Sequence, residues 1–189
     1  MAALVLGLIL LLGSHSLRVV SPAARGALVT AIGEGPYRAA FSLVTILGLV
    51  LIVWGFGLAW QEPEFLYTPP GWGRHVAMAL MIPALILAFA SAFPPGRIAR
   101  SFGHPLLTAT MLWGVSHLLA NGDLAGVVLF SAILVWAVLD RVLQPALPAK
   151  PAAEVSLRWD FAAIAAGIAL YVILVAGLHY RMFGVSPTG

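Results

Sequence analysis

The sequence predicts an all-α fold, a polytopic integral membrane bundle of about six transmembrane helices. Of its 189 residues, 61% are hydrophobic and only 9% are charged, and the mean hydropathy is +1.01. These values lie far from those of ordinary soluble domains. A bilayer core about 30 Å thick needs about 20 apolar residues per helical crossing, so the length allows about six crossings. We therefore expect a single transmembrane domain over residues 1–189.

Six apolar segments account for these crossings. They are Ala2–Val20, Tyr37–Trp60, His75–Phe93, His104–Ala120, Leu124–Leu143 and Phe161–His179. Pro, Gly and Asn residues fall between them, where loops are expected, and the longest loop, residues 144–160, contains the Pro/Ala-rich stretch Pro145–Pro151. No segment alternates polar and apolar residues as a barrel strand does, so helices are expected. The first segment lacks a preceding basic region, which favours a retained helix over a cleaved signal peptide.

The basic residues predict the orientation and argue against nucleic-acid binding, because they are scattered along the loops. With the N-terminus outside, only Arg74 and Arg181 of the ten Lys and Arg residues lie outside. The other eight lie inside: Arg18, Arg25, Arg38, Arg97, Arg100, Arg141, Lys150 and Arg158. The positive-inside rule therefore favours a topology with both termini outside.

Small residues predict where helices pack closely. Gly48 and Gly55 share one face of the second segment, and Ala163 and Gly167 form a small-xxx-small pair on the sixth. Such patterns allow two helix backbones to approach each other in a membrane. We expect packing, not ligand binding, from these positions.

Histidines are the candidate functional residues, since the chain has five of them and no cysteine. The absence of cysteine excludes disulfides and iron–sulfur ligation. His75, His104 and His179 lie near segment ends, where we expect interfacial anchoring. His15 and His117 are flanked by apolar residues within segments, where ionisable groups usually face a bundle interior and mark a site.

Each of these two histidines has polar neighbours at helical spacing. Thr110, Trp113, His117 and Asn121 share one face of the fourth segment, and Arg18 lies three residues after His15. A stripe of this polarity is not expected to face lipid. The alternative is that these groups only form hydrogen bonds between helices.

Spacing limits how the histidines can pair on a metal. His104 and His117 are 13 residues apart, a rise of roughly 20 Å along a helix, so they cannot hold one iron together. A two-histidine site must therefore use different helices, and His15 with His117 is the best-buried pair. Zinc is disfavoured, because we find no cysteine and no carboxylate within a span to complete a tetrahedral set. Haem needs only one or two imidazoles, an apolar slot and basic groups for its propionates.

Five motifs follow one another along the chain: GSHSLR at 13–18, GEGPYRAAFSLV at 33–44, TPPGWGRH at 68–75, FPPGRI at 93–98 and GHPLLTATMLWGVSHLLANGDLA at 103–125. They resemble the motifs of the NnrU family of small bacterial membrane proteins, which is associated with nitrogen-oxide metabolism and denitrification gene clusters. The resemblance implies a multi-pass protein of the bacterial inner membrane.

This family in turn resembles 15-cis-zeta-carotene isomerase, an integral membrane protein that uses haem b. The resemblance implies that His15 and His117 are the axial ligands of a haem b, with Trp113 and Asn121 beside His117. It implies that His104 or His75 stands beside a ligand or replaces one, and that Arg18 pairs with a propionate. With straight helices, His15 and His117 are offset by up to about 14 Å across the membrane, so His15 with His104 is the fallback pair.

The expected function is that of a haem-b membrane protein in nitrogen-oxide metabolism, acting by redox chemistry, nitric-oxide sensing or haem-dependent isomerisation of a hydrophobic small molecule. A second hypothesis is a non-enzymatic assembly factor for nitric-oxide reductase. A third is a methyltransferase that uses S-adenosylmethionine. It rests on His104-Pro105, which resembles the His-Pro of isoprenylcysteine carboxyl methyltransferase, although Gly103 stands where those enzymes have arginine.

Overall fold

The computed structural model describes residues 1–144 and 155–188, and in this part of the chain it is helical apart from loops and one β-bridge between Phe65 and Asp123. The all-α prediction is confirmed. The predicted loop stretch Pro145–Pro151, with Lys150, lies outside the described residues. Two compact units are formed: Met1–Tyr67 with Asp123–Ala132, and Thr68–Gly122 with Ile133–Gly189. We call them unit 1 and unit 2 and describe each by itself.

Five helical segments in the described chain are long and apolar enough to cross a membrane. They are α1 (Ala2–Val20), α3 (Glu34–Ala59), α4 (Gly73–Ala92), α7 (Leu124–Leu143) and the continuous run Leu157–Phe183. This last run consists of α8 (Leu157–Ile173), the π-helical turn η1 (Leu174–Leu178) and α9 (His179–Phe183). The sixth apolar helix, α6 (Pro105–Ala120), has 16 residues and is about 24 Å long. The protein is therefore a multi-pass membrane protein, and each predicted segment is a helix.

Unit 1 is built on the close contact of α1 and α3. A Cβ at Gly55 would collide with the backbone of Leu4, and a Cβ at Gly7 would lie 2.7 Å from the carbonyl oxygen of Gly48. The predicted packing role of Gly48 and Gly55 is thus confirmed. The outer face of α3 is apolar and exposed, as at Val53, which is 68% exposed, and such a face suits lipid.

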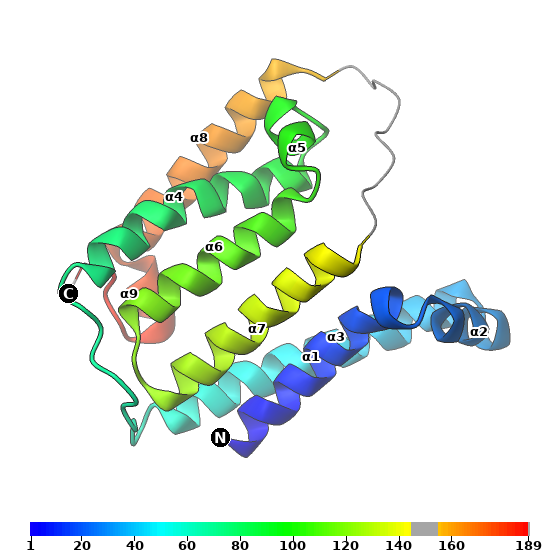
Figure 1. Ribbon diagram of the computed structural model, residues 1–189, viewed down its shortest axis with the longest axis horizontal. Coiled ribbons are helices and arrows are strands. Elements are labelled where there is room, and N and C mark those ends of the chain that lie inside the picture. Colours follow the sequence, from blue (N-terminus) through cyan, green and yellow to red (C-terminus); the bar gives the residue numbers. More distant parts are fainter. Residues whose placement is uncertain (145–154, 189) are drawn as a thin grey trace. The chain divides into compact units, whose positions relative to one another are not determined.

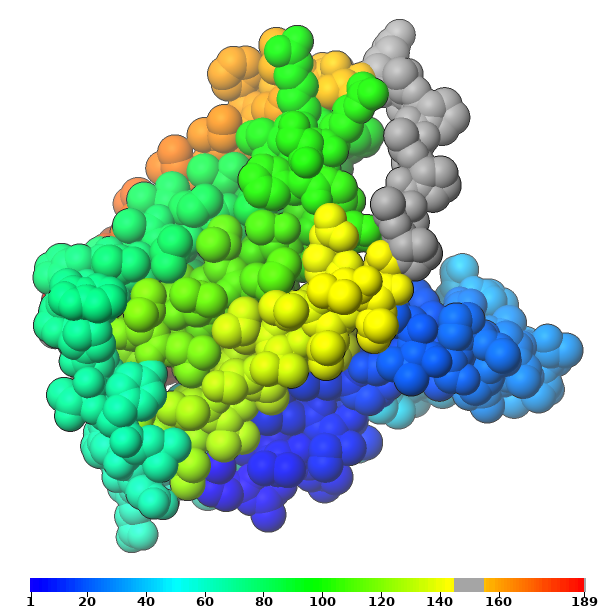
Figure 2. Space-filling model, in the orientation of Figure 1, coloured from blue at the N-terminus to red at the C-terminus, as the bar shows by residue number. Residues whose placement is uncertain are grey.

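The helix α2 (Pro22–Ile32) was not predicted. None of its residues is buried, and it extends from the end of the α1–α3 pair (Figure 2). Arg25 of α2 lies over the ring of Tyr37, with its guanidinium carbon 5.3 Å from the ring centre. The sequence signal was the Ser21-Pro22 pair, which ends α1 and also begins α2, because proline favours the first turn of a helix.

Asp123 fixes the start of α7. Its carboxylate is 2% exposed and accepts a hydrogen bond from the backbone N–H of Gly126 at 2.7 Å. The N–H of Leu124 donates to the carbonyl of Glu64 at 2.7 Å, which ties the helix start to the loop after α3. Asp123 is therefore a helix-capping residue.

In unit 2, α4 lies between α6 and α8 and contacts both (Figure 1). Gly167 of α8 packs so closely on Ile86 of α4 that a Cβ would lie 2.8 Å from the Cα of Ile86. Ala163, one turn earlier, is fully buried. The predicted small-xxx-small contact is therefore confirmed, and it brings α8 against α4.

Two carboxylates lie within spans, so the expectation that no span contains a carboxylate was wrong. Asp140 lies within α7, is 4% exposed, and accepts a hydrogen bond from the side chain of Gln144 at 2.7 Å. Asp160 lies in the first turn of α8, which begins earlier than predicted, and is 7% exposed. Its two oxygens accept hydrogen bonds from the N–H groups of Arg97 and Ile98, both at 2.9 Å, at the start of the unpredicted helix α5 (Arg97–Phe102). These hydrogen bonds offset the cost of burying the carboxylates.

Candidate histidine pocket

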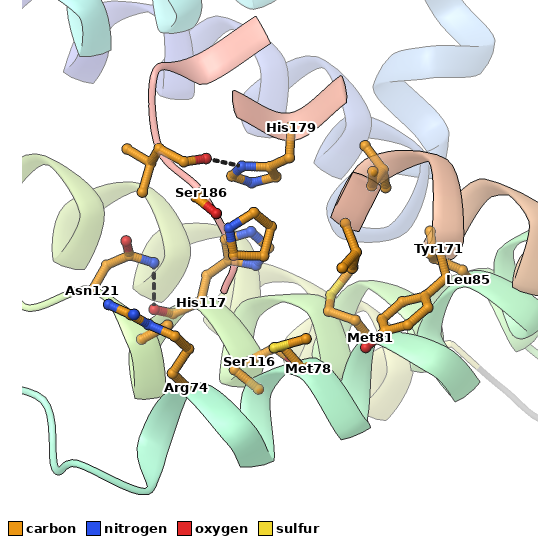
Figure 3. Close-up of a pocket in the computed structure, with 16 residues that line it drawn as sticks. Arg74, Met78, Met81, Leu85, Ser116, His117, Asn121, Tyr171, His179 and Ser186 are labelled. Carbon is orange, nitrogen blue, oxygen red and sulfur yellow. Dashed lines mark hydrogen bonds between the residues drawn. The ribbon is translucent and has the colours of Figure 1, made fainter. Parts of the chain in front are cut away.

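A pocket lies within unit 2, between the start of α4, the end of α6 and the residues that follow α8 (Figure 3). Its cavity volume is about 120 Å³. The polar residues that line it are Arg74, Ser116, His117, Asn121, Tyr171, His179 and Ser186. Its apolar wall includes Met78, Met81, Leu85, Leu174 and Val175. Two histidines and one arginine thus meet in an otherwise largely apolar space.

His117 lies in the last turn of α6, and its ring is held in a fixed orientation. Its Nδ1 lies 2.9 Å from the carbonyl oxygen of Trp113, one turn earlier, and the Trp113 ring lies beside it with centroids 4.8 Å apart. Because a carbonyl oxygen only accepts hydrogen bonds, Nδ1 carries the proton. In the neutral ring the lone pair is therefore on Nε2, which is the arrangement that most metal-binding histidines have.

Asn121 caps the same helix end. Its side-chain N–H donates to the carbonyl oxygen of His117 at 2.8 Å. Of the polar face predicted on the fourth segment, His117 and Asn121 line the pocket, and Trp113 supports the His117 ring. Thr110 does not line the pocket, and its hydroxyl donates to the carbonyl of Leu106 on its own helix.

His179, like Arg74, is a residue of this pocket that sequence reasoning missed. It was expected to be an interfacial anchor, but its ring lies next to that of His117, with centroids 6.5 Å apart and planes at 27°. Its Nδ1 lies 2.7 Å from the carbonyl oxygen of Val185, so this ring also has its proton on Nδ1. Figure 3 shows His179 above His117, with Arg74 and Asn121 together on one side.

The π-helical turn η1 places His179. Within η1, Gly177 has φ 136° and ψ −11°, a conformation that glycine adopts readily and other residues rarely do. Such turns change the direction of the side chains that follow and are frequent at functional sites. The sequence signal for this turn was a glycine, Gly177, two residues before His179, and hydropathy does not detect it.

The first predicted ligand, His15, lies in unit 1. Its Nδ1 is 2.8 Å from the carbonyl oxygen of Leu11, and its ring packs on Phe41 with centroids 5.0 Å apart. Arg18 is exposed in the last turn of the same helix, α1. His15 and His117 belong to different units, so their pairing stays a prediction.

The remaining predicted residues, His104 and His75, lie outside the pocket lining. His104 is the residue before α6, at the opposite end of that helix from His117, which confirms that these two cannot share one metal. Its Nε2 is buried and has no hydrogen-bond partner among the described residues. His75 is exposed in the first turn of α4, beside the pocket residue Arg74.

The donor set of the pocket limits what it can hold. Among residues 1–144 and 155–188, no group of three or more His, Cys, Asp or Glu side chains could hold a metal ion by itself. Haem makes a smaller demand, because the porphyrin supplies four nitrogens and the protein only one or two axial ligands. The histidines, the apolar wall and Arg74 fit that demand. The cavity is smaller than the roughly 300 to 1,000 Å³ of sites that bury a drug-sized ligand, so it would enclose only the part of a haem near the iron.

Comparison with known families gives a match to the model described as NnrU protein over residues 3–187. No curated protein and no solved structure matches the chain. The family match includes both units, the pocket histidines and the motifs that suggested the resemblance. This chain therefore belongs to the NnrU family.

Proposed function

We propose that this chain is a haem-b-binding membrane protein that acts in nitrogen-oxide metabolism. The observation that carries the proposal is the state of His117, whose Nδ1 is anchored on a backbone carbonyl so that Nε2 can bind a metal inside a pocket. The nitrogen-oxide context comes from the NnrU family, whose motifs suggested it and to which the chain belongs.

The pocket residues have distinct parts in this proposal. His117 binds the iron, and Arg74 pairs with a propionate, since its guanidinium lines the same pocket, whereas Arg18 lies in unit 1. The apolar wall of Met78 and Met81 keeps water from the iron. A bound haem b would supply an iron that exchanges one electron or binds nitric oxide, so redox chemistry and nitric-oxide sensing are the proposed activities. Haem-dependent isomerisation of a hydrophobic small molecule stays a prediction of the resemblance.

An absorption spectrum of detergent-purified protein, with and without dithionite, tests the proposal. We expect a Soret band that shifts on reduction, about one haem b per chain, and loss of most of that haem in His117→Ala. The matched control is Val115→Ala, which changes an exposed residue of the same helix outside the pocket. Nitric oxide added to the reduced protein should shift the band again.

Absence of a Soret band, under conditions that keep haem in other membrane cytochromes, would refute the haem proposal. The second hypothesis, an assembly factor for nitric-oxide reductase, would then predict that His117→Ala weakens capture of reductase subunits. Both proposals place the chain in the bacterial inner membrane.

The proposed orientation, with both termini outside, can be tested directly because the chain has no cysteine. We introduce Ala23→Cys in α2 or Gly71→Cys in the loop before α4, and both positions are exposed. A membrane-impermeant maleimide added to spheroplasts should label Cys at position 71 and spare Cys at position 23. The reverse labelling would show the opposite orientation.

A further inference from the structure

The structure assigns His179 as the second imidazole of the metal centre that His117 binds. This inference rests on the proposed haem function and names the ligand on the opposite side of the iron. It replaces the expected pairing of His117 with His15 by a pairing of two residues that meet in one pocket.

The separation of the two rings is the first argument. Because an imidazole nitrogen lies about 2 Å from a metal that it binds, two imidazoles on opposite sides of one metal have ring centres roughly 6 to 7 Å apart. On a tetrahedral metal the same bond length would bring the ring centres to about 5 Å. The observed separation of 6.5 Å between His117 and His179 matches the opposed arrangement.

The hydrogen bonds of the two rings are the second argument. Both rings place Nδ1 on a backbone carbonyl oxygen, that of Trp113 for His117 and that of Val185 for His179. Both therefore keep the Nε2 lone pair for a metal when neutral. His15 has the same Nδ1 contact, with the carbonyl oxygen of Leu11, so what distinguishes His117 and His179 is that both rings also lie in one pocket.

The backbone around His179 is the third argument. The π-helical turn with Gly177 precedes the histidine, and the chain then turns back after α9, so that Val185 holds the ring and Ser186 and Pro187 line the pocket. A π-helical turn is rare and is frequent at functional sites, and this one contains a kink at Gly177. Here it redirects His179 into a pocket that already contains a histidine.

The charges of the pocket select the class of metal centre. Among the described residues, no carboxylate lines the pocket, and Arg74 is the one lysine or arginine in its lining. The positive charge of Arg74 disfavours a bare divalent cation, and two imidazoles alone do not complete its ligand set. A metalloporphyrin, whose ring nitrogens neutralise the iron(II) charge and whose propionates are anionic, suits this set.

Electron paramagnetic resonance of the oxidised, haem-containing protein tests the inference. Iron with two imidazoles is low-spin, and iron that has lost one of them to water is high-spin. We expect a low-spin spectrum for the parent protein and a mostly high-spin spectrum for His179→Gly. Imidazole added to His179→Gly should restore the low-spin spectrum, because the free ligand can occupy the vacated position in a protein that is still folded.

Control variants separate the possible outcomes. Tyr180→Ala, at an exposed position next to His179, and His15→Ala should both stay low-spin. A high-spin parent protein, an unchanged low-spin spectrum in His179→Gly, or conversion to high-spin in His15→Ala would each overturn the inference while leaving haem binding intact. Absence of haem from the parent protein would overturn the proposed function and this inference together.

Discussion

Replacement of Asp160 should strongly destabilise the protein. The carboxylate is 7% exposed and accepts hydrogen bonds from two backbone N–H groups, at Arg97 and Ile98. Hydrogen bonds to a charged group contribute about 1.5 to 3 kcal/mol each, and both donors are only partly buried, so Asp160→Ala should cost roughly 2 to 4 kcal/mol. For a chain of this size that corresponds to a fall in Tm of about 5 to 15 °C.

The assay is thermal unfolding in detergent, followed by circular dichroism or tryptophan fluorescence, with Glu62→Gln as the control at an exposed carboxylate. Gly96→Ala gives an independent check. A Cβ at Gly96 would collide with Oδ1 of Asp160, so this change should destabilise the parent protein but have little effect in Asp160→Ala. A Tm for Asp160→Ala equal to that of the parent, or additive effects of the two changes, would refute the reasoning.

Three further predictions follow from local geometry. Gly55→Leu should separate α1 from α3 and lower the Tm, whereas Gly57→Leu, where a side chain meets open space, should not. Gly177→Ala should cost about 1 to 3 kcal/mol, because φ is 136°, and should also lower the low-spin fraction of bound haem. Burial raises the pKa of Tyr67, and the negative charge of Asp123 raises it further, so Asp123→Asn should lower the pH at which tyrosinate absorbance appears.

Ionisation of Tyr67 destabilises the folded protein. A folded-state pKa above the usual 10.0 means that folding favours the neutral phenol, so this stabilisation is full below pH 10 and is lost as the pH rises through the folded pKa. Tyr67→Phe should therefore lose less stability than the parent at high pH. An equal loss in both proteins would contradict the assignment, as would an unchanged Tm for Gly55→Leu or Gly177→Ala in the other two cases.

The spans were predictable from the sequence because a membrane imposes a strong and simple rule. A backbone in lipid must satisfy its own hydrogen bonds, so apolar runs of the right length become helices and their ends fall at Pro, Gly and Asn residues. Gly55 on α3 and Gly167 on α8 were also predictable, since small residues at helical spacing permit close contact.

The short helices and the capping carboxylates were not predictable in the same way. The six residues of α5 have no periodic pattern long enough to detect, and they are held by Asp160, which follows 58 residues after the end of α5 at Phe102. The mean hydropathy of the segment Leu124–Leu143 predicts a span and does not reveal that one of its residues, Asp140, is a buried carboxylate. Its burial depends on a partner one turn away, Gln144, which hydropathy alone does not identify.

In the pocket too, contacts within one helix were predictable from the sequence, and contacts that depend on the path of the following segment were not. His117 was found from the sequence because its neighbours Trp113 and Asn121 lie at helical spacing and complete its hydrogen bonds on one helix. His179 was placed at a span end by the same rule, and that placement is correct as a position along the chain. What the rule omits is direction, because η1 and Gly177 turn the ring inward and a carbonyl in the following tail holds it there.

For His179, the direction of the side chain says more about function than its position at the end of a span. A histidine at the end of a span can be solvated cheaply, so its position alone carries little information about function. The turn before His179 depends on a glycine, because φ at Gly177 is 136°, and it directs His179 toward a second histidine. If His179 were only an anchor, an unbroken helix from Leu157 to Phe183 would suffice, and Gly177 could be replaced by alanine with a gain in stability. The predicted loss of both stability and low-spin haem in Gly177→Ala separates these two explanations.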